Sequence, residues 1–134
     1  MKEWLDMKLK ILIIDDEKML LKTLNMLLTQ EGFVVRSASD GNAAISMFES
    51  EHFDLVITDI RMPGMDGLEV ARHIKRLDKD VEVIILTGFC TSDNAEEAFK
   101  IGVFCFLTKP LEDLDELLIP VTRALERRRF RLGN

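Results

Sequence analysis

Five polar side chains that could bind a cation or a phosphate follow short apolar runs of the sequence. Two adjacent carboxylates, Asp15 and Asp16, follow the first run, and a third, Asp59, follows a later one. The hydroxyl of Thr87 and the ammonium of Lys109 follow two further runs. Carboxylates that lie close together raise one another's pKa unless a cation neutralises them. Oxygen ligands suit a hard divalent cation, and Mg²⁺ is expected because it accepts few protein ligands and keeps several waters.

The apolar runs alternate with segments of helical periodicity, and this alternation predicts how the five side chains are positioned. Strands are expected at 10–14, 33–37, 55–58, 81–86 and 103–107, and helices near 20–28, 44–48, 68–77, 93–102 and 114–125. Such alternation predicts an α/β fold with a doubly wound parallel sheet and helices on both of its faces. Ligands of these sheets bind beyond the carboxyl ends of the strands, so the five side chains are expected at one rim.

Single residues predict where some of the helices begin, end or bend. Gly32 is expected to end the first helix and Asp93 to cap the fourth. Pro120 falls inside the last helix, where a missing N–H predicts a kink or a break. Two alternatives stay open: Asp16 could simply cap the helix that follows it, and Lys109 could be an ordinary surface lysine.

Length and composition narrow the class of protein. The chain has 134 residues, 47% hydrophobic and 31% charged, which fits one folded domain. Its longest uncharged stretch, residues 83–92, is far shorter than the roughly 18 apolar residues of a membrane span. Acidic residues within 1–8 argue against a secretory signal. The two cysteines are expected to be free thiols, so a cytoplasmic location is predicted.

Charge is unevenly distributed along the chain. The net charge is −6, yet residues 123–134 contain five Arg and one Glu, and residues 1–122 therefore carry −10. A body this acidic argues against nucleic acid as a direct partner. The arginines are expected on a solvated last helix, where the helix dipole favours cations near the C-terminus.

Four motifs together resemble the receiver domain of response regulators in bacterial two-component systems. They are residues 11–17 (Ile-Leu-Ile-Ile-Asp-Asp-Glu), 54–67 (with Asp-Ile-Arg-Met-Pro-Gly after the strand), 84–88 (Ile-Ile-Leu-Thr-Gly) and 106–110 (Phe-Leu-Thr-Lys-Pro). The resemblance implies a flavodoxin-like fold with five parallel strands in the order 2-1-3-4-5 and five helices. It divides the chain into an N-terminal extension (1–8), the receiver domain (9–126) and an Arg-rich tail (127–134), the tail being a candidate start of a linker.

The resemblance also implies roles for particular residues. Asp59 is the expected phosphoacceptor. Asp16 and Asp59 are expected to bind Mg²⁺ directly, Asp15 through a water, and the main-chain carbonyl of Arg61 is expected to complete the protein ligands. Lys109 is expected to pair with phosphoryl oxygens, Thr87 to turn its hydroxyl onto the phosphate, and Phe106 to move inward behind it. Arg61 and Phe89 flank the expected path of a hydrolytic water and are predicted to tune phosphoryl lifetime as a cation–π pair, unless Phe89 packs away against the fourth helix.

The implied function is a phosphorylation-activated signalling switch. Its partners would be a sensor histidine kinase or a histidine phosphotransfer domain and an output domain or downstream effector, reached through the surface of the fourth helix, fifth strand and fifth helix. A homodimer stays open, no metabolite is expected to be turned over, and catalysis is limited to self-phosphorylation and autodephosphorylation. A Mg²⁺-dependent phosphatase of the haloacid-dehalogenase class is the alternative, disfavoured because neither Asp15 nor Asp59 starts an Asp-x-Asp motif. A flavin carrier is disfavoured because acids occupy the expected phosphate loop.

Overall fold

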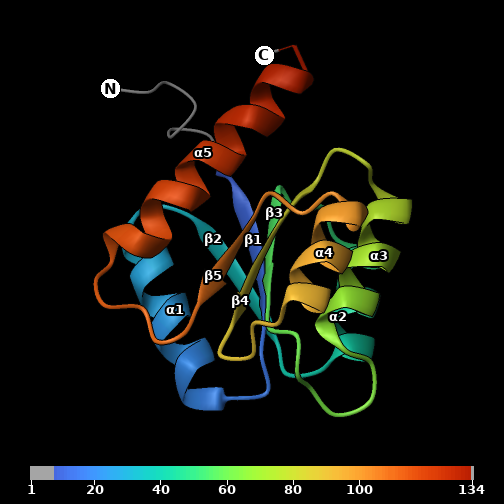
Figure 1. The fold of residues 1–134 in the computed structure, drawn as a ribbon. Coiled ribbons are helices and arrows are strands. Elements are labelled where there is room, and N and C mark those ends of the chain that lie inside the picture. The colour runs from blue at the N-terminus through green and yellow to red at the C-terminus, as the bar shows by residue number, and fades with distance from the viewer. Residues whose placement is uncertain (1–7, 134) are drawn as a thin grey trace.

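The computed structural model describes residues 8–133, in which five strands and five helices alternate along the chain (Figure 1). The strands are β1 (Lys10–Ile14), β2 (Val34–Ala38), β3 (Leu55–Thr58), β4 (Glu82–Thr87) and β5 (Cys105–Thr108). The helices are α1 (Lys18–Gln30), α2 (Gly41–Ser50), α3 (Gly67–Leu77), α4 (Ser92–Ile101) and α5 (Asp115–Arg131). The extension expected at 1–8 lies, except for residue 8, outside the described residues.

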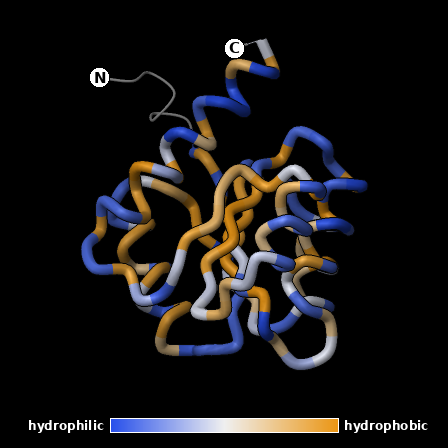
Figure 2. Tube along the Cα trace, viewed as in Figure 1, coloured by the Kyte–Doolittle hydropathy of each residue, from blue (hydrophilic) through white to orange (hydrophobic). Residues whose placement is uncertain are grey.

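The strands form one parallel sheet in the order β2-β1-β3-β4-β5, which confirms the expected fold. Helices α1 and α5 cover one face and α2, α3 and α4 cover the other (Figure 1). The central strands β1, β3 and β4 are buried along almost their whole length, and the chain trace is mostly apolar through the middle of the sheet (Figure 2). The edge strands β2 and β5 are partly exposed; β2 contains the polar residues Arg36 and Ser37, whereas β5 remains apolar up to Thr108.

The helix ends follow the local sequence with one correction. Gly32, with φ at +98°, follows α1 and donates its N–H to the carbonyl of Thr29, as expected for a residue that ends a helix. The cap of α4 is Thr91, whose hydroxyl accepts the N–H of Asn94, so the expectation that Asp93 caps this helix was wrong. Asp93 instead lies in the first turn, where its charge complements the helix dipole.

Helix α5 runs without a break from Asp115 to Arg131 although it contains Pro120. The expected break is therefore absent from this helix, and the alternative of a kink stays a prediction. Its packed side stays against the sheet on both sides of the proline, since Leu117 and Val121 are fully buried while Pro120 is only half-buried. The packing of this apolar side explains how one missing backbone hydrogen bond is tolerated.

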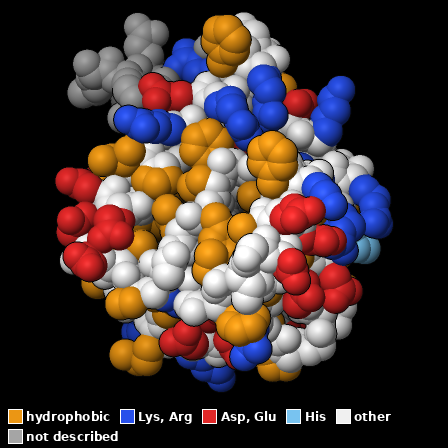
Figure 3. Space-filling model, in the orientation of Figure 1, with side chains coloured by type: hydrophobic (Ala, Val, Ile, Leu, Met, Phe, Trp, Pro, Cys, Tyr) orange, Lys and Arg blue, Asp and Glu red, His pale blue; other side chains and the backbone are white. Residues whose placement is uncertain are grey.

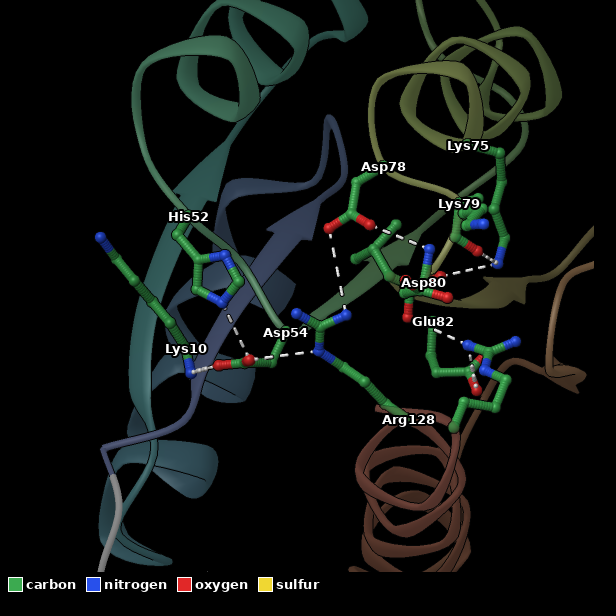
Figure 4. A network of polar contacts seen from close by, with 11 residues as sticks. Lys10, His52, Asp54, Lys75, Asp78, Lys79, Asp80, Glu82 and Arg128 are labelled. Carbon is green, nitrogen blue, oxygen red and sulfur yellow. Dashed lines mark hydrogen bonds and ion pairs between the residues drawn. The ribbon is translucent and has the colours of Figure 1, made fainter. Parts of the chain in front are cut away.

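Three arginines near the end of α5 form ion pairs with the sheet, and one of them, Arg128, is buried, which corrects the expectation that they are simply solvated. Arg127 donates two hydrogen bonds of 2.6 Å to Glu82, a carboxylate with no exposed surface at the start of β4. Arg131 donates to the same carboxylate at 3.0 Å. Arg128 is buried and pairs with Asp54, which precedes β3, at 3.3 Å (Figure 4). The last turns of α5 are thus fixed to the amino-terminal edge of the sheet.

Candidate functional site

The opposite, carboxyl-terminal edge of the sheet brings the chemically active side chains together. The backbone of Asp59 continues the ladder by donating its N–H to the carbonyl of Ile14 at 3.0 Å. Lys109 does the same toward the carbonyl of Thr87 at 2.9 Å. Each side chain is therefore fixed one residue beyond the end of a strand, Asp59 after the buried β3 and Lys109 after the partly exposed β5, at the edge where parallel α/β sheets bind their ligands.

The ammonium of Lys109 lies among three carboxylates. Its Nζ donates to Oδ2 of Asp15 at 2.7 Å, to Oε1 of Glu17 at 2.9 Å and to Oδ2 of Asp59 at 3.0 Å. Burial alone would lower the pKa of Lys109, but the hydrogen bonds that it donates to the three acids raise this pKa above its ordinary value. The lysine is thus a fixed positive charge at neutral pH, which excludes the alternative of an ordinary surface lysine.

Asp15 is almost fully buried, with 3% of its surface exposed. Burial raises the pKa of Asp15 from its ordinary value, and this effect outweighs the hydrogen bond from Lys109, which lowers it. The second oxygen of Asp15 accepts the N–H of Glu17 at 2.9 Å. Ionised Asp15 therefore needs a nearby cation, and the site supplies one in Lys109.

Asp59 has both carboxylate oxygens engaged. Oδ1 accepts the N–H of Ile60 at 2.7 Å, and Oδ2 accepts from Lys109. The loop that follows returns so closely that a Cβ on Gly67 would lie 1.7 Å from the carbonyl oxygen of Asp59, so only glycine fits there. The N–H of Gly67 donates to the carbonyl of Ile60 at 2.8 Å and closes the loop beside the carboxylate.

The donor atoms present fit a hard divalent cation. Carboxylate oxygens of Asp15, Glu17 and Asp59 lie within 4.8 Å of one another. Asp16 does not belong to this group: its side chain is exposed and lines an adjoining cleft together with Arg61. Charged oxygen ligands of this kind match Mg²⁺ chemistry. Asp16 also does not cap α1, because the cap position is occupied by Glu17.

Thr87 and Phe106 lie on neighbouring strands and point to the same face of the sheet. Phe106 pairs in register with Ile85, two residues before Thr87, and side chains two residues apart on a strand share a face. Phe106 is half-buried and packs against the apolar cluster under α2, α3 and α4. The hydroxyl of Thr87 is buried and accepts the N–H of Phe89 at 3.2 Å.

Arg61 and Phe89 are in contact across the mouth of the adjoining cleft. The guanidinium carbon of Arg61 lies 3.6 Å from the centroid of the Phe89 ring, which confirms the expected cation–π pair. Phe89 is 38% exposed and lines the cleft with Asp16, so it has not packed away from the site. The role of this pair in phosphoryl lifetime stays a prediction.

Comparisons with known proteins identify relatives of this arrangement. A family model described as the response regulator receiver domain matches residues 11–121. The chain is 34% identical over 116 residues to the sporulation initiation phosphotransferase F of Bacillus subtilis, covering 87% of this chain and 93% of that protein. It is 37% identical over 117 residues to the regulatory protein AtoC of Escherichia coli, covering 87% of this chain but only 25% of AtoC. The chain thus spans about a quarter of the length of AtoC.

Solved structures give the same result. A response regulator receiver domain from Clostridium thermocellum superimposes with a TM-score of 0.85 at 37% identity, covering 91% of this chain and 98% of that one. The response regulator TrrA of Thermotoga maritima, solved in complex with Mg²⁺ and BeF, has a TM-score of 0.79 at 34% identity, covering 87% and 98%. Within residues 8–133, no helix is both long and apolar enough to cross a membrane.

Proposed function

The chain belongs to the response regulator receiver domain family, and we propose on that premise that it is a signalling switch set by phosphorylation of Asp59. The observation that carries the proposal is the position of Lys109, whose ammonium bridges Asp59 and Asp15 at the sheet edge. A lysine placed there can pair with oxygens of a phosphoryl group bound to Asp59.

The proposed reaction transfers a phosphoryl group from a phosphohistidine of a sensor kinase or histidine phosphotransfer domain. A carboxylate oxygen of Asp59 attacks phosphorus, the phosphorus–nitrogen bond breaks, a phosphorus–oxygen bond forms, and the departing imidazole takes up a proton from water. Because Lys109 binds Asp59 and Asp15 together, it can reduce the repulsion between the nucleophile and the incoming group. Hydrolysis of the acyl phosphate then resets the domain, without turnover of a metabolite.

The residues proposed to bind Mg²⁺ are Asp15, Asp16, Asp59 and the carbonyl of Arg61. When bound, the ion would neutralise charge on the transferring phosphoryl group. Asp15 and Asp59 are buried and already close together, whereas Asp16 and Arg61 line the adjoining cleft. This chain's contribution is to keep two carboxylates desolvated and oriented, Asp15 by its bond from the N–H of Glu17 and Asp59 by its bond from that of Ile60.

The proposed readout runs through Thr87 and Phe106. When the hydroxyl of Thr87 turns toward phosphoryl oxygens, it leaves its hydrogen bond with the N–H of Phe89. Phe106 lies on the neighbouring strand, opposite Ile85, and its side chain is on the same face of the sheet as that of Thr87. Phe106 can then move into the vacated space. The surface that would change is formed by α4, β5 and α5, where Figure 3 shows hydrophobic side chains in the middle and acidic groups on both flanks. Phosphorylation would bias a two-state element in this way.

We propose that this surface meets an output domain or effector protein, since AtoC and related regulators are several times longer than this chain. The acidic body supports a protein rather than a nucleic acid as the direct partner. The two cysteines are free in the structure and fit the proposed cytoplasmic location. The haloacid-dehalogenase alternative receives no support, because Asp59 is followed by Ile60 and Arg61 and the matching family is that of receiver domains.

Labelling with a small phosphodonor tests the proposed function. Wild-type protein with Mg²⁺ should gain a hydroxylamine-sensitive phosphoryl group, and Asp59→Asn should gain none. Asp93→Asn is a matched control, because it also neutralises an aspartate but one that is exposed in the first turn of α4. Labelling of Asp59→Asn at the wild-type level would contradict the assignment.

A further inference from the structure

Glu17 is a third partner of Lys109 for which neither the motifs nor the proposed reaction supplies a role. An ammonium has three N–H donors, and on Lys109 each is directed to a different carboxylate. Two of these, Asp15 and Asp59, are the acids proposed to bind the divalent cation. We propose that Glu17 is a positioning residue that keeps Lys109 at the sheet edge while Asp15 and Asp59 bind the cation. This inference rests on the proposed function and deepens it.

The local backbone places Glu17 for this task. Oδ1 of Asp15 accepts the N–H of Glu17 at 2.9 Å, so the backbone of residue 17 is fixed directly to one of the buried acids. Glu17 occupies the cap position of α1, yet its side chain makes no capping hydrogen bond within the described chain. It extends instead to Lys109, 92 residues later in the sequence. Its side chain is therefore committed to the lysine rather than to the helix end.

Glu17 differs from the other two partners of Lys109 in its solvent exposure. The side chains of Asp15 and Asp59 are 4% and 8% exposed, whereas that of Glu17 is 62% exposed. A divalent cation and the ammonium of Lys109 compete for the two buried acids, because both are attracted by the same carboxylate charge. Glu17 lies within 4.8 Å of both acids, but it is the exposed member of the three and is not among the ligands proposed for the cation, so it can keep the ammonium while the two buried acids bind the cation. Without Glu17, the lysine would be bound only by the acids that the cation also needs.

A double-mutant cycle on Mg²⁺ affinity tests the inference without requiring any phosphorylation. Mg²⁺ would be titrated into wild type, Glu17→Gln, Lys109→Met and the double variant at constant ionic strength, with dissociation constants read from backbone NMR shifts. Glu17→Gln should weaken Mg²⁺ binding about fivefold when Lys109 is present and less than about twofold when it is replaced. Equal weakening in both backgrounds, or none in either, would overturn the inference, since Glu17 would then be a general charge or a bystander.

Two further variants show whether the effect on Mg²⁺ affinity comes from the position of the carboxylate of Glu17 or only from its negative charge. Glu17→Asp retains the charge and should restore part of the lost affinity. Glu112→Gln removes an exposed acid close to Lys109 in sequence and should leave Mg²⁺ affinity unchanged. An effect of Glu112→Gln as large as that of Glu17→Gln would show that net charge alone is responsible and would overturn the inference.

A second measurement needs no variant of Lys109 and so avoids any folding defect of that variant. The rate of labelling by a small phosphodonor would be followed against Mg²⁺ concentration for wild type and Glu17→Gln. The half-saturating concentration should rise about fivefold while the saturating rate changes less than about twofold. A lower saturating rate with an unchanged half-saturating Mg²⁺ concentration would overturn the inference. Absence of labelling in wild type would refute the proposed function instead, while the Mg²⁺ titration would still report on Glu17.

Discussion

The contact between Arg61 and Phe89 gives a prediction about single residues and phosphoryl lifetime. The ring of Phe89 has no hydrogen-bond acceptor to orient a water, and the guanidinium of Arg61 lies against it at 3.6 Å. A cation–π contact at an exposed position contributes about 0.5–1 kcal/mol, enough to bias the ring toward the cleft. Phe89→Glu should therefore speed loss of the phosphoryl group about tenfold, equivalent to about 1.4 kcal/mol of barrier.

Decay of the phosphorylated protein, followed in excess Mg²⁺ for wild type, Phe89→Ala and Phe89→Glu, checks this prediction. Phe89→Ala is the matched control because it removes the ring without adding an acceptor. If all three rates agree within about twofold, the barrier differs by only about 0.4 kcal/mol and the contact does not control hydrolysis.

The two cysteines should differ in reactivity. Cys90 is exposed, whereas burial beside β4 and α5 raises the pKa of Cys105 to about 11 from 9.0, an effect that the nearby charge of Arg127 only partly opposes. The half-buried position favours the neutral thiol, so its contribution to stability is complete below pH 9.0 and is lost as pH rises toward 11. An alkylating agent near neutral pH should modify Cys90 first.

Urea unfolding at about pH 8 and about pH 10.5 measures the same effect as a free energy. Wild type should lose more stability between these two values than Cys105→Ala, which has no thiol to ionise at this position. Equal losses in the two proteins would show that Cys105 ionises as freely in the folded protein as in the unfolded one.

The positions of the site residues were predictable from the sequence where the end of a strand fixed them, and their roles stay proposals. Asp15, Asp59, Thr87 and Lys109 converge because each lies at the end of a strand in one parallel sheet. The contact of Glu17 with Lys109 was missed, since it depends on a side-chain direction across two loops. The only sequence signal for it was a third acid directly after Asp15 and Asp16.

The attachment of helix α5 to the sheet depends on ion pairs with a buried carboxylate. Glu82 is fully buried and receives both hydrogen bonds of Arg127, with a further one from Arg131. Removing one partner of a buried pair leaves a desolvated charge incompletely compensated. Arg127→Met should therefore lower the free energy of unfolding by about 2 kcal/mol or more, with Arg131 limiting the loss.

Chemical denaturation of Arg127→Met beside Arg123→Met would measure this difference. Arg123 is the matched control because it lies on the same helix but is exposed. Its replacement should change stability by less than about 0.5 kcal/mol. Similar losses in both variants would contradict a specific role for the Arg127–Glu82 pair.

The strands and helices were predictable from the periodicity of apolar residues in the sequence. The features of α5 that differ from the expectation have physical causes. Each expected strand appears within two residues of its expected ends, because buried parallel strands have continuous apolar sequences. The continuity of α5 through Pro120 was not predictable, since it depends on packing against the sheet. Its last turns were likewise expected in solvent, because pairing of arginines with Glu82 and Asp54 requires the folded sheet.

At the scale of the whole molecule, β3 and β4 connect two charged regions. Their carboxyl ends carry Asp59 and Thr87, and their amino ends adjoin Asp54 and Glu82, which bind α5 (Figure 4). Fluoroberyllate with Mg²⁺ should therefore shift backbone NMR signals in α4, β5 and α5 as well as around Asp59. The same addition to Thr87→Ala should leave α4, β5 and α5 much less affected. Wild-type shifts limited to the loop after Asp59 would contradict the proposed readout.

Locating the phosphoryl group on the chain tests most directly whether Asp59 is the phosphoacceptor. Borohydride reduction converts an aspartyl phosphate into homoserine, which peptide mass spectrometry then assigns to one position. After treatment with a small phosphodonor and Mg²⁺, we expect homoserine at position 59 and unmodified aspartate at positions 15 and 16. Homoserine at 15 or 16, or unmodified aspartate at all three positions in protein shown to be folded, would contradict it.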